Sequence, residues 1–146
     1  MKLPRLLHIK FLAKKCGQLL DHRFTSLGLT DTKVRTLSAL AHHSPLTATD
    51  LLPWTEVEKA SLTTLLQSLE REGYIERQPH PTDGRAVLLS ITDEGREVQR
   101  KAFDALHKAD EDLFSVFTDE DSQEFRRLCD LLFARLDELG VGCRRK

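Results

Sequence analysis

The segment 77–95 concentrates side chains that could act on a partner molecule, and its tip carries Asp83 and Arg85. Two prolines and a glycine within residues 79–84 favour a turn, and apolar residues alternate along 87–91 as in a half-buried strand. The segment therefore predicts a β-hairpin with an exposed guanidinium. Such a group can enter a narrow DNA minor groove, with the Asp83 carboxylate accepting a hydrogen bond that orients it. The alternative is a salt bridge confined to the turn.

A second set of polar side chains precedes the hairpin, on a predicted helix over residues 59–71. Four leucines between residues 62 and 69 follow the spacing of an amphipathic helix and leave the opposite face small and polar. Such a face can reach base edges and phosphates, and the alternative is a solvated surface. We expect Arg77, at the base of the hairpin, to meet phosphate or an acidic neighbour. The residues predicted to contact DNA are Lys59, Ser61, Thr63, Thr64, Gln67, Arg71, Arg77, Asp83 and Arg85.

Two longer helices are predicted before these elements. Apolar residues recur at helical spacing from about residue 6 to residue 27, and Gly28 should end that helix. Thr30 has the residue type of an N-cap and predicts a second helix, which should break at residues 42–45, where a proline follows two histidines and a serine.

A short third helix should follow. Thr47 can cap it, and Pro53 should end it by about Leu52, because proline lacks an N–H and moves the preceding residue out of the α region. Thr55 with Glu58 then predicts a capping box at the start of the fourth helix.

The same kinds of signal place the remaining elements. Gly73 suits the left-handed position that closes the fourth helix before the hairpin. Thr92 should cap a fifth helix, and Thr118 with Asp121 should begin a sixth, which Gly140 ends.

This order of elements predicts a mainly α fold with a small β-hairpin wing, that is, a winged helix-turn-helix lobe with N- and C-terminal dimerisation helices. We expect an N-terminal dimerisation helix over 1–28, a DNA-binding region over 29–98 and C-terminal dimerisation helices over 99–146. The first and last helices are more apolar than a small winged core requires. A homodimer in which they pack against a second copy is therefore expected.

Composition limits the range of functions. The chain has 146 residues, 40% hydrophobic and 31% charged, and a net charge of −1, so it lacks the basic excess typical of nucleic-acid binders. A winged protein-interaction module that has lost DNA binding is the alternative. No nucleophile stands beside a base in a recognised arrangement, so we do not expect an enzyme. Basic residues interrupt the apolar N-terminal stretch, which predicts a cytoplasmic protein without a membrane segment.

Several of these segments resemble the MarR family of bacterial regulators. The sharpest is Asp83-Gly-Arg85 followed by residues 87–95, which is similar to the family's wing signature of Asp-x-Arg, an apolar strand, Leu-Thr and Gly. Residues 28–30 and 69–77 support it. The resemblance implies a triangular homodimer of winged lobes that binds a pseudo-palindromic operator, represses nearby genes and is often released by a small anionic or phenolic ligand. The chain departs from the family's pattern at Pro53, Glu56 and Glu58.

A pocket for such an effector should lie where the first, second and fifth helices meet the DNA-binding lobe. Approximate helix placement and the value of a basic group for a carboxylate suggest its lining. The candidates are Phe11, Lys15, Arg23, Leu40 and His43. We expect no cofactor or metal, because the histidines at 42 and 43 lack partners at ligand spacing and the three cysteines, Cys16, Cys129 and Cys143, are widely separated.

Overall fold

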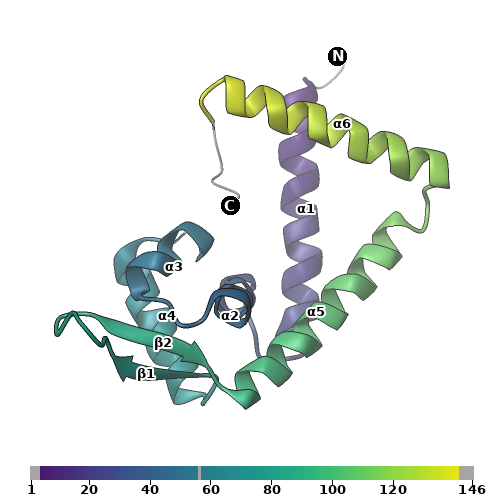
Figure 1. The fold of residues 1–146 in the computed structure, drawn as a ribbon. Coiled ribbons are helices and arrows are strands. Elements are labelled where there is room, and N and C mark those ends of the chain that lie inside the picture. Colours follow the sequence, from purple (N-terminus) through teal and green to yellow (C-terminus); the bar gives the residue numbers. More distant parts are fainter. Residues whose placement is uncertain (1–3, 56, 142–146) are drawn as a thin grey trace. The chain divides into compact units, whose positions relative to one another are not determined.

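The computed structural model describes residues 4–55 and 57–141, so Glu56 and Cys143 lie outside it. It is mainly helical with one antiparallel hairpin, which confirms the predicted fold class (Figure 1). The elements are α1 Arg5–Thr25, α2 Asp31–His43, α3 Ala48–Thr55, α4 Lys59–Arg71, β1 Ile75–Pro79, β2 Val87–Ile91, α5 Asp93–Phe114 and α6 Asp119–Glu138. The chain divides into two compact units, Met1–Ala109 and Asp110–Lys146. The predicted domain limits at 28 and 98 stay predictions.

Four helices begin at the threonines that the sequence indicated. In each case the threonine hydroxyl oxygen accepts the backbone N–H of the residue three positions later, which satisfies one of the free donors of the first turn. The pairs, with their N···O distances, are Thr30–Lys33 at 3.3 Å, Thr47–Asp50 at 3.2 Å, Thr92–Gly95 at 3.0 Å and Thr118–Asp121 at 3.1 Å. At α6 the Asp121 carboxylate also accepts the Thr118 N–H, so the predicted start of this helix is a complete capping box.

The expected end of α3 at Leu52 is wrong, because α3 continues through Pro53 to Thr55. Proline at this position removes only the hydrogen bond to the carbonyl of Thr49. Both Pro53 and Thr49 are exposed, so water can satisfy that carbonyl. The extra turn places Trp54 against the His43 ring, with ring centroids 4.9 Å apart and planes at 28°.

The predicted capping box between Thr55 and Glu58 is also wrong. Thr55 is a buried residue of α3, and its hydroxyl donates to the Leu52 carbonyl at 3.4 Å. Glu58 itself occupies the N-cap position of α4 without a side-chain capping bond. Because α3 extends to Thr55, this residue lies one turn beyond Leu51 and is buried in the core with it.

The hairpin pairs β1 with β2 in antiparallel register, from Ile75 opposite Ile91 to Pro79 opposite Val87. Leu46, just before α3, adds a bridge to Leu89, with backbone hydrogen bonds of 2.8 and 3.0 Å. The sequence did not indicate this third strand segment. It ties the start of α3 to the wing.

Close backbone contact fixes the base of the wing. Gly73 adopts φ +78°, and the N–H groups of Gly73 and Tyr74 donate to the carbonyls of Glu70 and Leu69, which forms the Schellman ending expected for α4. The Thr92 hydroxyl donates to the Gly73 carbonyl at 2.6 Å. A Cβ on Gly95 would lie 2.1 Å from the Tyr74 carbonyl oxygen, so only glycine fits there.

The core of the first unit lies among α2, α3, α4 and the hairpin, with α1 and α5 contributing at its edges. Its side chains come from every one of these elements. They are Phe24, Leu29, Leu37, Ala39, Leu40, Leu51, Leu62, Leu66, Leu69, Ile75, Leu89, Ile91 and Ala102. This core holds the outward face of α4 and the wing in place, because the buried leucines of α4 fix which of its residues face solvent.

The second unit consists of the end of α5, a turn and α6. Phe114, Phe117 and Phe125 form an aromatic cluster with ring centroids 5.2 to 5.7 Å apart. Phe117 lies beyond the end of α5, in the connection to α6. No residue of α6 is buried.

Candidate nucleic-acid interface

The polar face of α4 lies open to solvent, as its leucine pattern indicated. Leu62, Leu66 and Leu69 are buried, and Leu65 is half-buried. The residues predicted to contact DNA from this helix are all exposed, namely Lys59, Ser61, Thr63, Thr64, Gln67 and Arg71. Most of them are short, so a partner surface could approach the helix closely along its first three turns.

Two residues limit the contacts that the polar face of α4 can make. The Thr63 hydroxyl donates to the Lys59 carbonyl at 3.2 Å, so it offers its oxygen as an acceptor. Glu58 stands at the N-cap of α4. A carboxylate suits the positive end of a helix dipole, and here it also repels phosphate from that end. Contact with a duplex would therefore rest on the middle and the end of α4.

The wing loop is tied together by polar contacts. The His80 Nδ1 accepts the backbone N–H groups of Thr82 at 3.2 Å and of Asp83 at 3.0 Å. The Asp83 carboxylate accepts the backbone N–H of Arg85 at 3.0 Å. We expected it to hold the Arg85 guanidinium, and this detail is corrected: Asp83 shapes the loop, because the nearer donor is the main-chain N–H that the turn brings to it.

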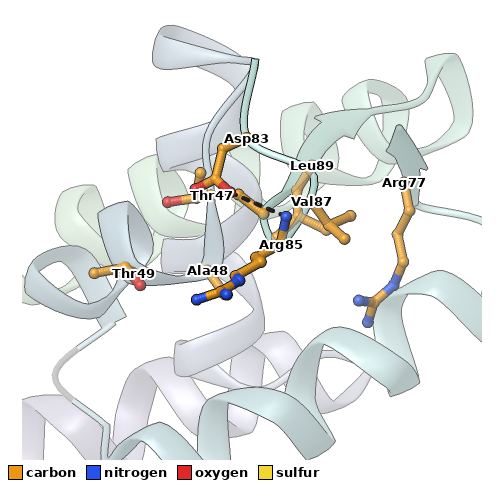
Figure 2. Close-up of a pocket in the computed structure, with 9 residues that line it drawn as sticks. Thr47, Ala48, Thr49, Arg77, Asp83, Arg85, Val87 and Leu89 are labelled. Carbon is orange, nitrogen blue, oxygen red and sulfur yellow. Dashed lines mark hydrogen bonds between the residues drawn. The ribbon is translucent and has the colours of Figure 1, made fainter. Parts of the chain in front are cut away.

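A groove of about 460 Å³ runs between the start of α3 and the wing. Figure 2 shows Arg85 extending along the Ala48 and Thr49 side of this groove, with Arg77 standing apart from those residues. Backbone and side-chain groups of both elements form its walls. The lining residues are Thr47, Ala48, Thr49, Arg77, Asp83, Arg85, Ala86, Val87 and Leu89. Two arginines therefore share one concave surface, which is suited to an anionic partner.

Thr47 lies on this surface because it caps the start of α3. Its hydroxyl and its backbone N–H both donate to the Asp50 carboxylate, at 2.7 and 2.9 Å. These bonds lower the pKa of Asp50 below its ordinary value, so the carboxylate stays charged at neutral pH. The positive end of α3 is thus already partly neutralised by the chain's own acid.

Arg77 has an acidic neighbour, one of the two partners expected for it. Its Nε donates to the Glu70 carboxylate at 2.7 Å, and both side chains remain more than a third exposed. Glu70 belongs to the last turn of α4, and Arg77 to the middle of β1. The ion pair therefore joins the predicted recognition helix to the base of the wing.

The residues suggested for an effector pocket do not gather around one cavity. Phe11 and Lys15 are exposed on α1, Arg23 is half-buried, and Leu40 is fully buried in the core. His43 alone among them lines one of the hollows found here, a depression of about 230 Å³ between α2 and α3.

The walls of that hollow include residues that sequence reasoning missed. They are Arg35, Ser38, Ala39, His42, His43 and Trp54. Four of these recur at i, i+3, i+4 and i+7 on α2, which was a usable signal for a shared face. Trp54 could not have been placed, because the expected end of α3 at Leu52 excluded it from the helix.

Among residues 4–55 and 57–141, no cluster of three or more histidines, cysteines or acids could hold a metal ion. None of the helices in the described part of the chain is long and apolar enough to cross a membrane.

Helix α3, the connection after it, α4 and the following hairpin define a winged helix-turn-helix protein. A model of the MarR family matches residues 27–86, which span this region up to the wing loop. Residues 27–86 are therefore similar to the MarR family, and the chain as a whole resembles relatives named as HTH-type transcriptional regulators.

Particular relatives show how far the similarity extends. The HTH-type transcriptional repressor YetL of Bacillus subtilis is 28% identical over 127 residues, covering 86% of this chain and 76% of YetL. The apo structure of MarR from E. coli matches with a TM-score of 0.80 at 22% identity, over 90% of this chain and 98% of that one. A mutant E. coli MarR complexed with operator DNA matches with a TM-score of 0.73 at 23% identity, over 88% and 91%. At these identities the structural matches establish the fold.

Proposed function

We propose that this protein is a homodimeric transcriptional regulator that binds a pseudo-palindromic operator and represses nearby genes. The observation that carries the proposal is the exposed polar face of α4 beside a wing groove with two arginines. YetL, a relative, is named as a repressor, and a MarR protein of the same fold has been solved with operator DNA. These similarities support the proposal without replacing the geometry.

In this proposal the middle of α4 enters the major groove. Thr64 and Gln67 supply short or flexible donors and acceptors for base edges, and Arg71 and Arg77 approach phosphates. Arg85 reaches the minor groove from the wing, where its charge is attracted by the focused negative potential. Asp83 accepts the backbone N–H of Arg85 and so fixes the loop backbone. It thereby positions the Arg85 side chain without contacting the guanidinium.

The homodimer is supported by two apolar faces that the described residues leave uncovered. On α1, five large apolar side chains are exposed, on α6 six are, and Leu139 follows directly after that helix. They are Leu6, Leu7, Ile9, Phe11 and Leu12 on the first helix, and Phe125, Leu128, Leu131, Leu132, Phe133, Leu136 and Leu139 at the other end of the chain. Exposed apolar patches of this kind mark interaction surfaces, and we assign them to a second copy.

An Arg85→Ala variant tests the DNA-binding part. We expect affinity for a selected duplex to fall by about 1–3 kcal/mol, because the variant loses a charged groove contact. Arg100→Ala is the matched control: it removes an exposed arginine of α5 that pairs with Glu97 and faces no groove residue named above. Gel shifts over a salt series measure both. Equal affinities for Arg85→Ala, Arg100→Ala and the unchanged protein would remove Arg85 from the interface.

A winged protein-interaction module remains the rival, favoured by the net charge of −1 and by Glu58 at the start of α4. Salt dependence separates the two functions. Binding to duplex DNA should weaken with a log–log slope of about −0.9 for each phosphate contact, because contacts release condensed counterions. Failure to bind any duplex at low ionic strength would favour the protein-interaction module.

Selection of bound fragments from random duplexes would give the operator sequence and its half-site spacing.

Release by a small anionic or phenolic effector is the remaining part of the proposal. Its candidate site is the hollow at His43 and Trp54, which is lined by these two stacked rings and by Arg35, whose guanidinium pairs with Asp31. Trp54 is the chain's only tryptophan, so tryptophan fluorescence reports on this site alone. Titration with benzoate, a simple aromatic anion, should change the emission and weaken DNA binding over the same concentration range. A change in neither would leave the hollow without an effector role.

A further inference from the structure

We propose that the Glu70 carboxylate competes with DNA phosphate for Arg77 and thereby limits how tightly this protein holds a duplex. The inference rests on the proposed DNA-binding function and adds a residue that restrains it. Glu70 lies outside the set of residues predicted to contact DNA, and it acts on one of them through a direct ion pair.

The geometry resembles that of a phosphate contact. A carboxylate oxygen of Glu70 accepts the Nε–H of Arg77 at 2.7 Å, a distance typical of a charge-assisted hydrogen bond. An arginine uses the same planar donors for carboxylates and for phosphates. While Glu70 occupies Nε, a phosphate cannot use that donor, and the carboxylate charge beside the guanidinium repels the incoming phosphate.

The pair can open without disturbing the fold. The side chains of Arg77 and Glu70 are 37% and 41% exposed, and ion pairs at such accessible positions contribute little to stability. The neighbouring pair of Lys33 with Glu72 differs, since the Lys33 side chain is only 13% exposed and links α2 to the end of α4. Glu72 therefore belongs to the structure of the lobe, whereas Glu70 holds a cation that faces the groove.

The two arginines of the groove are consequently unequal. Within residues 4–55 and 57–141, the Arg85 guanidinium has no ion pair, and only its backbone N–H is held, by Asp83. Arg85 can meet a phosphate or a groove edge directly. The charge of Arg77 is already partly neutralised by Glu70 and its Nε is occupied, so its contact with a phosphate contributes less binding free energy and releases less counterion.

The test compares Glu70→Gln with Glu76→Gln. Glutamine keeps the size of the side chain and an acceptor oxygen but removes the charge. Glu76 is the matched control, because it is an exposed glutamate next to Arg77 on β1 and accepts only a long hydrogen bond, 3.5 Å, from the Gln78 side chain among the described residues. Both variants change net charge equally, so long-range attraction to DNA rises equally in both. The excess effect of Glu70→Gln measures competition for Arg77.

Binding is measured by fluorescence anisotropy with a labelled mixed-sequence duplex long enough for two half-sites, between about 50 and 200 mM salt. We expect Glu70→Gln to bind about two- to fivefold more tightly than Glu76→Gln at the lowest salt. The magnitude of its salt slope should rise by up to about 0.9. Adding Arg77→Ala to each variant should abolish the difference between them.

Several results would overturn the inference. Equal binding of Glu70→Gln and Glu76→Gln would show no competition, and weaker binding of Glu70→Gln would show that Glu70 orients Arg77 for DNA. A difference that survives Arg77→Ala would place the effect elsewhere. These outcomes leave the proposed function intact, because the unchanged protein still binds DNA. If the unchanged protein and both variants ignore the duplex, the proposed function fails as well.

Discussion

The winged lobe and the last helix use leucine in opposite ways. In the lobe, Leu37, Leu40, Leu51 and Leu69 have no exposed surface, and they belong to one core and come from three helices, α2, α3 and α4. In α6 the leucines follow an equally regular helical stripe, yet none is buried and Leu131 is 56% exposed. A helical pattern predicts a face that must be covered; it does not say which surface covers it.

This difference separates a self-contained part of the molecule from one that depends on a partner. The lobe closes its core with segments distant in sequence, such as Leu46 against Leu89. At the beginning of α6, Phe125 packs against Phe114 and Phe117, whereas the leucines farther along the helix stay exposed among the described residues. On the proposed function, a second copy covers the rest.

The largest expected effect is on assembly. Leu132→Asp places a charge in the middle of the α6 stripe, where the exposed fraction of the leucine is 50%. A two-fold dimer loses two buried leucines, at about 1.5–3 kcal/mol each, so association should weaken by roughly 3–6 kcal/mol. Light scattering after size-exclusion chromatography should show monomers, while the lobe keeps its circular dichroism.

Ala134→Asp is the matched control for that prediction. It introduces the same residue into the same helix, but two positions away and so on the opposite side, at about 100° per residue. This variant should assemble like the unchanged protein. Dimers of Leu132→Asp as tight as those of Ala134→Asp would mean that the α6 face does not join two copies.

The next effect should fall on the lobe itself. Gly95→Ala forces a Cβ to 2.1 Å from the Tyr74 carbonyl oxygen and 2.7 Å from Ile91, at the junction of wing and α5. Overpacking of this kind costs about 3 kcal/mol. Thermal and denaturant unfolding should show a large loss of stability.

Gly17→Ala provides the comparison for that result, because a Cβ on Gly17 meets no atom within 4 Å. Replacing a helical glycine by alanine should stabilise α1 by up to about 1 kcal/mol. A small effect of Gly95→Ala, similar in size to that of Gly17→Ala, would show that the wing base is looser than its contacts imply.

The sequence predicted those features whose partners lie close together in the chain. A threonine three residues before its N–H partner specified the starts of α2, α3, α5 and α6. Gly73 specified the end of α4 in the same local way. The exposed polar face of α4 followed from the spacing of its leucines. Such features depend on backbone geometry within one or two turns, so they can be deduced without knowing the fold.

Apart from the local contact between Asp83 and Arg85, the failures involve contacts over a longer range. Pro53 continues α3 because the lobe buries Leu51 and Thr55 on either side of it, a tertiary gain that outweighs one missing hydrogen bond. The pairing of Leu46 with Leu89 joins segments far apart in the chain. At the site, the sequence predicted that Arg77 contacts either phosphate or an acidic neighbour. The structure is needed to identify Glu70 as that neighbour.

The smallest expected effect compares two identical caps, one in each region. The pKa of Asp121 is lowered by hydrogen bonds from the backbone N–H and hydroxyl of Thr118, and that of Asp50 by the hydroxyl and N–H of Thr47. The folded pKa in each case lies below the ordinary value of 3.8. Each cap therefore contributes fully above that value and is lost as the pH falls through the lowered pKa.

The consequence of losing the cap should differ between the regions. Helix α3 is held by buried Leu51 and Thr55, so its first turn should persist when Asp50 is protonated. Helix α6 has no buried residue, so its first turn should fray when Asp121 is protonated, above all in the Leu132→Asp variant, where no second copy holds it. Backbone NMR shifts of residues 119–122 and 48–51 through an acid titration measure this. Equal fraying of both helices would mean that the burial of Leu51 and Thr55 does not hold the first turn of α3 once its cap is lost.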